Sequence, residues 1–280
     1  MIVDAHHHLW RIGKNGHEWP TPDLEAIHCD FEAADLARVL AGTGVEATVL
    51  VQSQPSDRDT GWLLDVAAEH DLIKGVVGWT DLAAPDAAAR IRTLAQKPKL
   101  KGLRPMLQGL PEDDWILKAE VRPALAAMID HGLSLDALVF TRHLPAIVAL
   151  ASARPDLDIV IDHGAKPPLA TSADMPQKME TWRGLMSRAA GLPNIACKLS
   201  GLFTELAPGQ DPTDATPVAD HLLAAFGPDR LMWGSDWPVV DLQGGYAPWL
   251  DWTRRWIDNG KSHAREAILS RTACAFYRLN

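Results

Sequence analysis

The sequence predicts a (β/α)₈ barrel in which residues 1–280 form a single domain. About eight short apolar runs, each typical of a buried strand, recur along the chain and alternate with amphipathic helical segments. No change of composition divides the chain, and no GxGxxG motif follows the first run. Both features favour a closed barrel over an open doubly wound sheet, which shows the same alternation of strands and helices.

Each predicted strand combines β-branched and other apolar residues in a short run. The first begins with Ile2 and Val3 and carries Asp4, His6 and His8 at its carboxyl end. The other seven are expected at residues 47–53, 74–82, 100–107, 133–139, 158–165, 195–202 and 230–238. Strands of this length and spacing leave room for one helix after each of them.

The helices are predicted from apolar residues at helical spacing, with proline near the first turn and Asp or Ser ahead of it as start signals. They are expected at residues 60–70, 85–96, 119–131, 143–153, 176–190, 217–226, 249–258 and 262–277. Two connections, residues 11–30 and 201–216, are longer than ordinary loops and follow predicted strand ends. In a barrel such loops cover the active site, so both are candidate lids.

Composition excludes several classes of partner. The formal net charge is −9, and no cluster of Lys and Arg marks a site for nucleic acid or an anionic membrane surface. The first residues do not predict a signal peptide, because His6 to His8 interrupt what would be its apolar segment, and no apolar run approaches the ~20 residues of a spanning helix. Three cysteines, Cys29, Cys197 and Cys274, lack metal-type spacing, and their odd number disfavours a disulfide framework. We expect a cytoplasmic protein that acts on a small molecule; a monomer and a homo-oligomer are both open.

Two histidines at the end of the first strand share one face. Residues two apart in a strand point to the same side, so His6 and His8 can bring two imidazoles to one centre while His7 turns away. This arrangement suits a metal ion or an electrophile. Because the carboxyl ends of barrel strands converge on one mouth, we expect the partners of this pair at the ends of other strands.

The remaining strands deliver further polar and aromatic side chains to the same mouth. In chain order these are Gln52 or Gln54, Trp79, Arg104, Asp162, His163, Lys198, Ser200, Asp236 and Trp237. Each has an ordinary alternative, such as a turn cap for Asp236, a satisfied core group for His163, or core packing for the tryptophans. Arg104 and Lys198 lie within apolar strands, where an unpaired charge is costly. Taken together, the set favours an active site.

Three motifs resemble those of the amidohydrolase superfamily, and the resemblance extends over essentially the whole chain. They are DxHxH at residues 4–8, DHxxKP at residues 162–167 and GSDWP at residues 234–238. More narrowly, they are similar to the branch that contains sugar-acid and dicarboxylate lactonases. The resemblance implies that His6, His8 and Asp236 surround the reactive centre and that His163 polarises the substrate carbonyl. It also implies that Arg104 and Lys198 contact the substrate.

The resemblance also bears on metal content. The ligands would be His6, His8, His163 and Asp236. Two-metal relatives carry a carboxylated lysine at the end of the fourth strand, where this chain has Arg104. A binuclear centre is therefore not expected, and one divalent ion, with zinc first, or none are both open.

The residue types fit the hydrolysis of a lactone, which is an ester. Asp236 would take the proton from water as general base, and His163 would polarise the carbonyl. The residues expected to bind substrate are Arg104, Lys198, Lys166, Trp79, Trp237 and Gln54. We expect a neutral aldonolactone first. Dicarboxylate lactones, decarboxylation by a member of the same superfamily, and sugar-acid binding without turnover are the alternatives.

Overall fold

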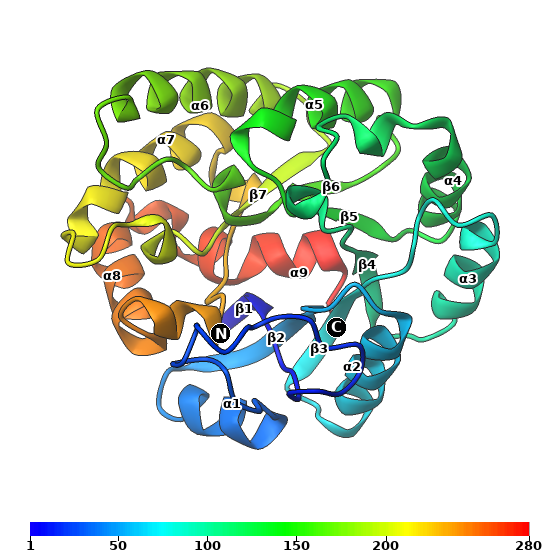
Figure 1. The fold of residues 1–280 in the computed structure, drawn as a ribbon. Coiled ribbons are helices and arrows are strands. Elements are labelled where there is room, and N and C mark those ends of the chain that lie inside the picture. The colour runs from blue at the N-terminus through cyan, green and yellow to red at the C-terminus, as the bar shows by residue number, and fades with distance from the viewer. Residues whose placement is uncertain (280) are drawn as a thin grey trace.

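The computed structural model describes residues 1–279 and contains the predicted barrel of parallel strands (Figure 1). The strands are hydrogen-bonded in chain order. They are β1 (Ile2–His7), β2 (Val45–Val51), β3 (Ile73–Gly78), β4 (Leu100–Leu103), β5 (Ser134–Ala137), β6 (Ile159–Ile161), β7 (Ile195–Leu199) and β8 (Leu231–Trp233). Parallel strands need covered crossovers, which the helices supply.

Within residues 1–279, eight α-helices surround the strands, and a ninth, α9, lies across the middle of the view in Figure 1. They are α1 (Ala33–Leu40), α2 (Asp57–Glu69), α3 (Ala87–Leu94), α4 (Arg122–Asp130), α5 (Leu144–Ala153), α6 (Met175–Ala190), α7 (Thr216–Phe226), α8 (Tyr246–Asp258) and α9 (Thr272–Tyr277). Within residues 1–279, no helix combines the length and the apolar character that crossing a membrane requires.

The barrel closes between β8 and β1 just beyond the end of β8. The backbone N–H of Asp236 donates to the carbonyl of His6 at 2.8 Å, and that of His8 donates to the carbonyl of Trp237 at 2.7 Å. Gly234 makes this approach possible, because a Cβ at that position would lie 2.6 Å from the Cβ of His6. Closure therefore brings the histidines of β1 beside Asp236.

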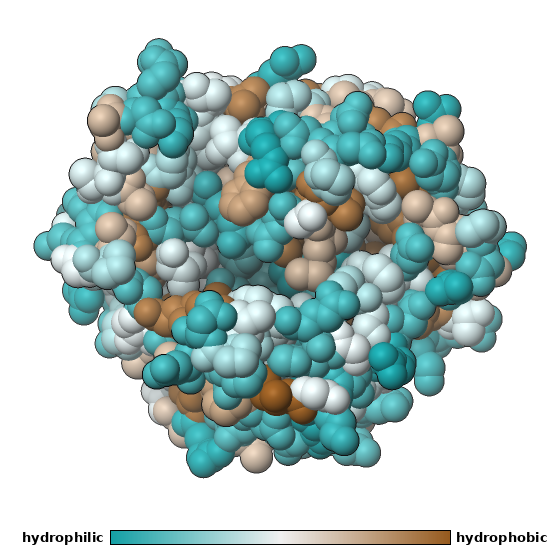
Figure 2. All heavy atoms as spheres, in the orientation of Figure 1, coloured by the Kyte–Doolittle hydropathy of each residue, from teal (hydrophilic) through white to brown (hydrophobic). Residues whose placement is uncertain are grey.

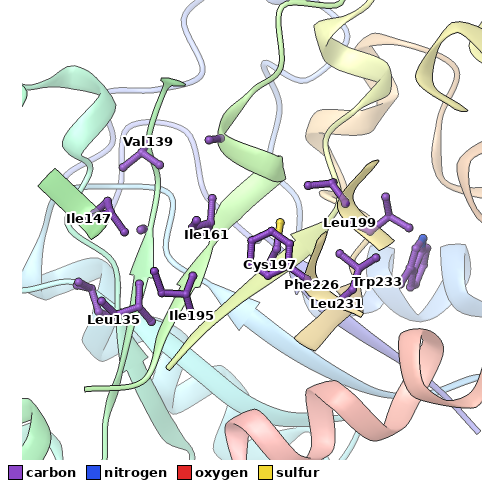
Figure 3. Close-up of a cluster of buried hydrophobic side chains, with 14 of the residues drawn as sticks. Leu135, Val139, Ile147, Ile161, Ile195, Cys197, Leu199, Phe226, Leu231 and Trp233 are labelled. Atoms are coloured by element: carbon purple, nitrogen blue, oxygen red, sulfur yellow. The ribbon is translucent and has the colours of Figure 1, made fainter. Parts of the chain in front are cut away.

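Two apolar layers hold the barrel together. The outer layer packs strands against helices, as Figure 3 shows for Ile161, Cys197 and Leu231 from the strands with Ile147 of α5 and Phe226 of α7. The inner layer fills the barrel with small and β-branched residues from the strands, and Ala273 and Tyr277 of α9 pack against it. A filled interior leaves only the mouth for chemistry.

The structure departs from the predicted elements in three ways. Helix α1 was not predicted, although Leu36 and Leu40 face the core at helical spacing. The segment predicted as one helix at 262–277 contains a 3₁₀ turn, a π-helical segment at Ala267–Arg271 and then α9. Five strands end earlier than expected. Those predicted at 74–82, 100–107, 158–165, 195–202 and 230–238 end at Gly78, Leu103, Ile161, Leu199 and Trp233. The backbone turns there, which aims the polar residues that follow into the mouth.

Candidate active site

A cavity of about 230 Å³ opens at the carboxyl ends of the strands. On the space-filling view, this face is hollowed near its centre, with hydrophilic residues around the hollow (Figure 2). Polar groups form one part of its wall, namely His8, Ser53, Arg104, Gln108, His163, Lys166 and Asp236. Apolar side chains form the other part, namely Trp19, Met106, Leu138 and Val239. The cavity therefore offers both hydrogen-bonding groups and an apolar surface.

Three histidines and one aspartate converge at the base of this cavity. Nε2 of His6 lies 3.1 Å from Nε2 of His8 and 3.6 Å from Oδ1 of Asp236. Oδ1 of Asp236 lies 3.2 Å from Nε2 of His8 and 3.8 Å from Nε2 of His163. All four side chains are almost completely buried. The structure thus brings together the four residues that the sequence places at one centre.

The second nitrogen of each of these rings has a partner outside the cluster. Nδ1 of His6 lies 3.1 Å from Nζ of Lys198. Nδ1 of His8 lies 2.8 Å from the carbonyl oxygen of Val51, which can only accept, so this nitrogen carries a proton. Nδ1 of His163 pairs with the Ser200 hydroxyl at 2.9 Å. Partners of this kind fix the orientation of rings that act through their other nitrogen.

The cluster shifts its own protonation equilibria. Burial lowers the pKa of His163 to about 4, against the opposing effect of Asp236 and Asp162, so His163 is neutral at neutral pH. Burial alone would raise the pKa of Asp236. The surrounding imidazoles, first His163 and then His8, favour the carboxylate and hold the pKa of Asp236 below its ordinary value. At neutral pH the site therefore contains an ionised carboxylate beside neutral imidazole.

Two of these groups stand on unusual backbone. Residues 163–166 all have left-handed conformations, with φ of 52°, 55°, 60° and 51°, and only Gly164 among them is a glycine. Asp236 has φ of 58°. A left-handed conformation costs a non-glycine residue about 1–2 kcal/mol, and such strain persists only where surrounding contacts impose it. The strained turn directs the side chains of both His163 and Lys166 to the cavity.

Lys198 does not line this cavity. It lies inside β7, fully buried, with Nζ 2.6 Å from Asp136, 3.0 Å from Asp162 and 3.1 Å from Nδ1 of His6. The resemblance implied a substrate contact, whereas the structure places the ammonium behind His6. Arg104 does line the cavity, and its NH1 lies 3.2 Å from Asp162. Its Nε is a buried donor without a partner among residues 1–279.

Three other predicted substrate contacts lie outside the cavity lining. Trp79 is half-buried, and its backbone bonds the Thr60 hydroxyl. Trp237 is buried and packs edge-on against Phe31, with ring centroids 5.2 Å apart. The Gln54 amide bonds the backbone of Trp19, accepting from its N–H at 3.3 Å and donating to its carbonyl at 2.6 Å. Gln54 thereby anchors the loop that brings Trp19 to the cavity.

Lys166 lines the cavity and pairs with a residue that sequence reasoning did not single out. Its Nζ lies 3.5 Å from Glu205 on the loop after β7. Burial raises the pKa of Glu205, which the charge of Lys166 partly offsets. Glu205 falls within the predicted lid at 201–216.

Sequence reasoning also did not single out two apolar residues of the cavity wall. Met106 and Leu138 follow the ends of β4 and β5. Position after a strand end was the available signal for Met106 and Leu138, but neither is titratable, so neither was singled out.

The amidohydrolase family model matches residues 3–279. The chain belongs to the amidohydrolase family. It is 45% identical to an L-fucono-1,5-lactonase of Burkholderia ambifaria, across 99% of this chain and 96% of that protein. An L-fucono-1,5-lactonase of Burkholderia multivorans is 32% identical across 100% and 96% of the two chains. A crystal structure of an amidohydrolase from Burkholderia multivorans with bound zinc is 31% identical, covers 100% of both chains and superposes with a TM-score of 0.93.

The donor set of this amidohydrolase can hold a divalent metal ion. His6, His163 and Asp236 each offer one ligand atom, and these atoms lie within 4.8 Å of one another. Imidazole nitrogen and carboxylate oxygen are ordinary ligands of divalent metals. The Ser200 partner of His163 is the kind of outer contact that metal-binding histidines have. The residues present therefore fit such an ion on chemical grounds.

Proposed function

We propose that this amidohydrolase hydrolyses a neutral sugar-acid lactone to the free acid. The observation that carries the proposal is the ionised carboxylate of Asp236, buried among three imidazoles where it faces a small cavity. A carboxylate so placed can accept a proton from water. Among the residues 1–279 that line the cavity there is no cysteine, and Ser53 is the one serine. Ester hydrolysis by activated water is the chemistry that this arrangement supports.

Each proposed step uses a named group. Asp236 removes a proton from water as the water oxygen attacks the lactone carbonyl. The unpartnered Nε–H of Arg104 and a ring N–H of His163 are the donors for the oxyanion that develops. As the ring C–O bond breaks, Asp236 returns the proton to the departing ring oxygen. The products balance, because one water and one lactone give one hydroxy acid.

The cofactor proposed for this site is one zinc ion, held by His6, His163 and Asp236 with His8 beside them. When bound, such an ion lowers the pKa of its water to about 7 and polarises a carbonyl. The nitrogen of His163 that would bind the ion would carry no proton, and its Nδ1 faces Ser200, so Arg104 would remain the donor for the oxyanion. Asp236 holds the proton, and Arg104 and Lys166 line the cavity where the substrate binds.

The charges around the cavity favour a neutral lactone over a dicarboxylate. Arg104 already faces Asp162, and Lys166 already faces Glu205, so a substrate carboxylate would compete with a carboxylate of the protein. The apolar wall of Trp19, Met106, Leu138 and Val239 suits a methyl group. We therefore place 6-deoxy aldonolactones first, with L-fucono-1,5-lactone as the leading candidate, in agreement with the names of the two lactonase relatives.

The test is a substrate panel in which acid release is followed with a pH indicator. L-Fucono-1,5-lactone and its 6-hydroxy counterpart, L-galactono-1,5-lactone, form a matched pair that differs at the apolar wall. We expect a higher kcat/KM for the 6-deoxy lactone, by about 10-fold, because an apolar pocket rejects an added hydroxyl only modestly. A pyrone dicarboxylate and an aromatic carboxylic acid are the controls. Faster turnover of the dicarboxylate, or release of CO₂ without lactone hydrolysis, would overturn the proposal.

A further inference from the structure

Two tryptophans from the outer helices reach the backbone beside the strained residues of the site. The indole Nε1–H of Trp182, on α6, donates to the carbonyl of Gly164 at 2.7 Å. That of Trp249, on α8, donates to the carbonyl of Gly234 at 2.9 Å. Both side chains are buried. Each bond therefore ends one or two residues from a group placed in the chemistry, His163 in one case and Asp236 in the other.

The first bond holds the left-handed turn at residues 163–166. A turn of this hand is disfavoured for L-residues and needs contacts from outside to persist. Within the turn, Lys166 N–H donates to the carbonyl of His163 at 2.9 Å. Trp182 supplies the donor for Gly164, and Leu222 of α7 packs so closely that a Cβ on Gly164 would lie 3.2 Å from it. Helices α6 and α7 thus enclose the turn from outside the barrel.

The second bond holds the chain where β8 gives way to Asp236. Gly234 N–H donates to the carbonyl of Leu199 at 3.1 Å, and Trp249 occupies the Gly234 carbonyl. The Ser235 N–H donates to Oδ1 of Asp4 at 2.8 Å, so the peptide between Gly234 and Ser235 is held on both sides, by Trp249 and by Asp4. The next peptide is held by the Asp236 N–H, which donates to the carbonyl of His6 at 2.8 Å, so Trp249 fixes the backbone directly before the residue that carries the carboxylate.

A third tryptophan provides an internal comparison. Trp256 lies on the same helix as Trp249, is also buried, and donates its Nε1–H to Asp220 at 2.8 Å. Asp220 belongs to α7 and does not line the cavity. The three indoles share an environment between helices and an N–H donor. They differ in whether the acceptor is the backbone of the site.

We propose that Trp182 and Trp249 are positioning residues for lactone hydrolysis, Trp182 acting through His163 and Lys166 and Trp249 acting through Asp236. This inference rests on the proposed function. Neither indole lines the cavity, so neither touches the substrate. Each fixes a carbonyl that determines where a group of the site stands, and a displacement of about 1 Å at a reacting group can cost about 100-fold in rate.

The experiment compares Trp182→Phe, Trp249→Phe and Trp256→Phe, each of which keeps an aromatic ring and removes one N–H. All are assayed well below their Tm, so that each population is folded. For Trp249→Phe we expect kcat to fall by about 10-fold or more with KM within about 2-fold, because the effect passes through the general base. For Trp182→Phe we expect kcat to fall and KM to rise, because Lys166 also moves. Trp256→Phe should keep both constants.

A double-mutant cycle identifies the route. In an Asp236→Asn background, Trp249→Phe should lower kcat no further, since its target is already lost, whereas additive effects would contradict that route. A lower Tm in all three variants with unchanged kcat would mean that the indoles serve the fold alone and would overturn the inference. Loss of folding in both site variants would overturn it as well.

A structural readout separates this inference from the proposed function. If the wild type hydrolyses no lactone, the proposed function fails, but crystal structures of the variants still decide the positioning roles. Trp249→Phe should displace the Asp236 carboxylate relative to His8, and Trp182→Phe should displace the His163 ring relative to Ser200. Unmoved side chains in both would contradict the inference, whatever the substrate.

Discussion

Two regions of the barrel contain the same residue types in different roles. We call the interior around Lys198 and Asp136 the floor, and the carboxyl ends of the strands, where the cavity opens, the mouth. In the floor, Lys198 and Asp136 lie inside strands with Nζ and Oδ2 2.6 Å apart, and the Tyr277 hydroxyl of α9 donates to the same carboxylate at 2.6 Å. In the mouth, Asp236 lies beyond a strand end with imidazole nitrogens at 3.2 to 3.8 Å, and it faces the cavity. Both carboxylates are buried. Only the second has room for a substrate beside it.

The difference follows from the position of each residue relative to the end of its strand. A polar side chain within a strand points into the filled barrel and must be neutralised by its neighbours there. One placed just after the strand end stands on a turn that can aim it into open space. Charges of the floor therefore serve stability, and charges of the mouth are available for chemistry. Substitutions in the two regions should accordingly separate loss of folding from loss of activity.

The largest effect is expected in the mouth, for Asp236→Asn. The amide keeps the shape of the carboxylate but cannot take a proton from water, so kcat should fall by about 10² to 10⁴. Substrate binding and the free energy of unfolding should change little. Steady-state kinetics on the best lactone measures the first, and urea unfolding measures the second. Metal content must be measured on both proteins, because Asp236 is also a candidate ligand.

The pH profile gives this prediction a second check. The pKa of Asp236 is held below its ordinary value, so the carboxylate is ready at mildly acid pH and is lost only as the pH falls further. The acid limb of kcat/KM in the wild type should lie correspondingly low, and it should disappear or move in Asp236→Asn. If the Asn variant retains metal and near wild-type turnover, the general base is another group, and His163 is the first candidate.

In the floor, Lys198→Met should affect stability more than substrate binding. Removal of the ammonium leaves Asp136 and Asp162 buried without their shared partner, and breaking a buried pair costs about 3–5 kcal/mol. Lys178→Met is the matched control, because Lys178 pairs with Asp174 on the surface. We expect the control to change the free energy of unfolding by less than about 0.5 kcal/mol. A stable Lys198→Met protein with a strongly raised KM would instead assign Lys198 to substrate binding.

Much of this division could be predicted from the sequence. Strand order and the barrel follow from apolar runs, and HxH spacing with a carboxylate after the last run indicates a shared centre. His6, His8, His163 and Asp236 do lie together. These features depend on local pattern and on the convergence of strand ends, which any barrel imposes.

The rest depends on contacts that sequence pattern does not contain. Whether Lys198 lies inside β7 or beyond it decides between floor and mouth, and a difference of one or two residues is below the resolution of strand prediction. The left-handed turn at 163–166 is held by contacts from α6 and α7, which are distant in the sequence. The local pattern of residues 158–165 does not contain these contacts and therefore predicted a continuing strand. Trp19, Trp79 and Trp237 were all expected near the mouth from position alone, and of these three only Trp19 lines the cavity.

Arg104 has contacts in both the floor and the mouth, and its replacement tests whether it serves substrate binding. Its NH1 faces Asp162 and the barrel interior, while its unpartnered Nε belongs to a side chain that lines the cavity. Arg104→Met should lower kcat/KM by about 10 to 100-fold, the scale of losing a charged hydrogen bond of roughly 1.5 to 3 kcal/mol. Arg142→Met, at an exposed arginine that pairs with Asp113, is the control. Equal kcat/KM in wild type and Arg104→Met would remove Arg104 from the site.

The smallest effect concerns Asp59, a buried carboxylate of α2 that lies against the backbone after β2 and has poor partners. Its Oδ2 accepts from the backbone N–H of Ser53 and Gln54 at 3.3 and 3.4 Å, and its Oδ1 has no partner among residues 1–279. Burial, only partly offset by these bonds and by the charge of Arg104, raises the pKa of Asp59 from 3.8 to about 7. Between these two values the unfolded chain loses the proton while the folded protein keeps it.

The sign of the effect on stability follows directly. Ionisation of the unfolded chain favours unfolding, so the contribution of Asp59 to stability is greatest below pH 4 and is lost as the pH rises toward 7. Relative to Asp59→Asn, the wild type should lose about 1 kcal/mol per pH unit in this window, just under the limit of ~1.4 kcal/mol per unit for one group. Urea unfolding at several pH values measures the difference, and Asp57→Asn, an exposed acid in the same helical turn, is the control. Parallel stability curves for wild type and Asp59→Asn would show that Asp59 is ionised in the folded protein. Asp59 would then not differ in charge from the well-paired carboxylates of the floor.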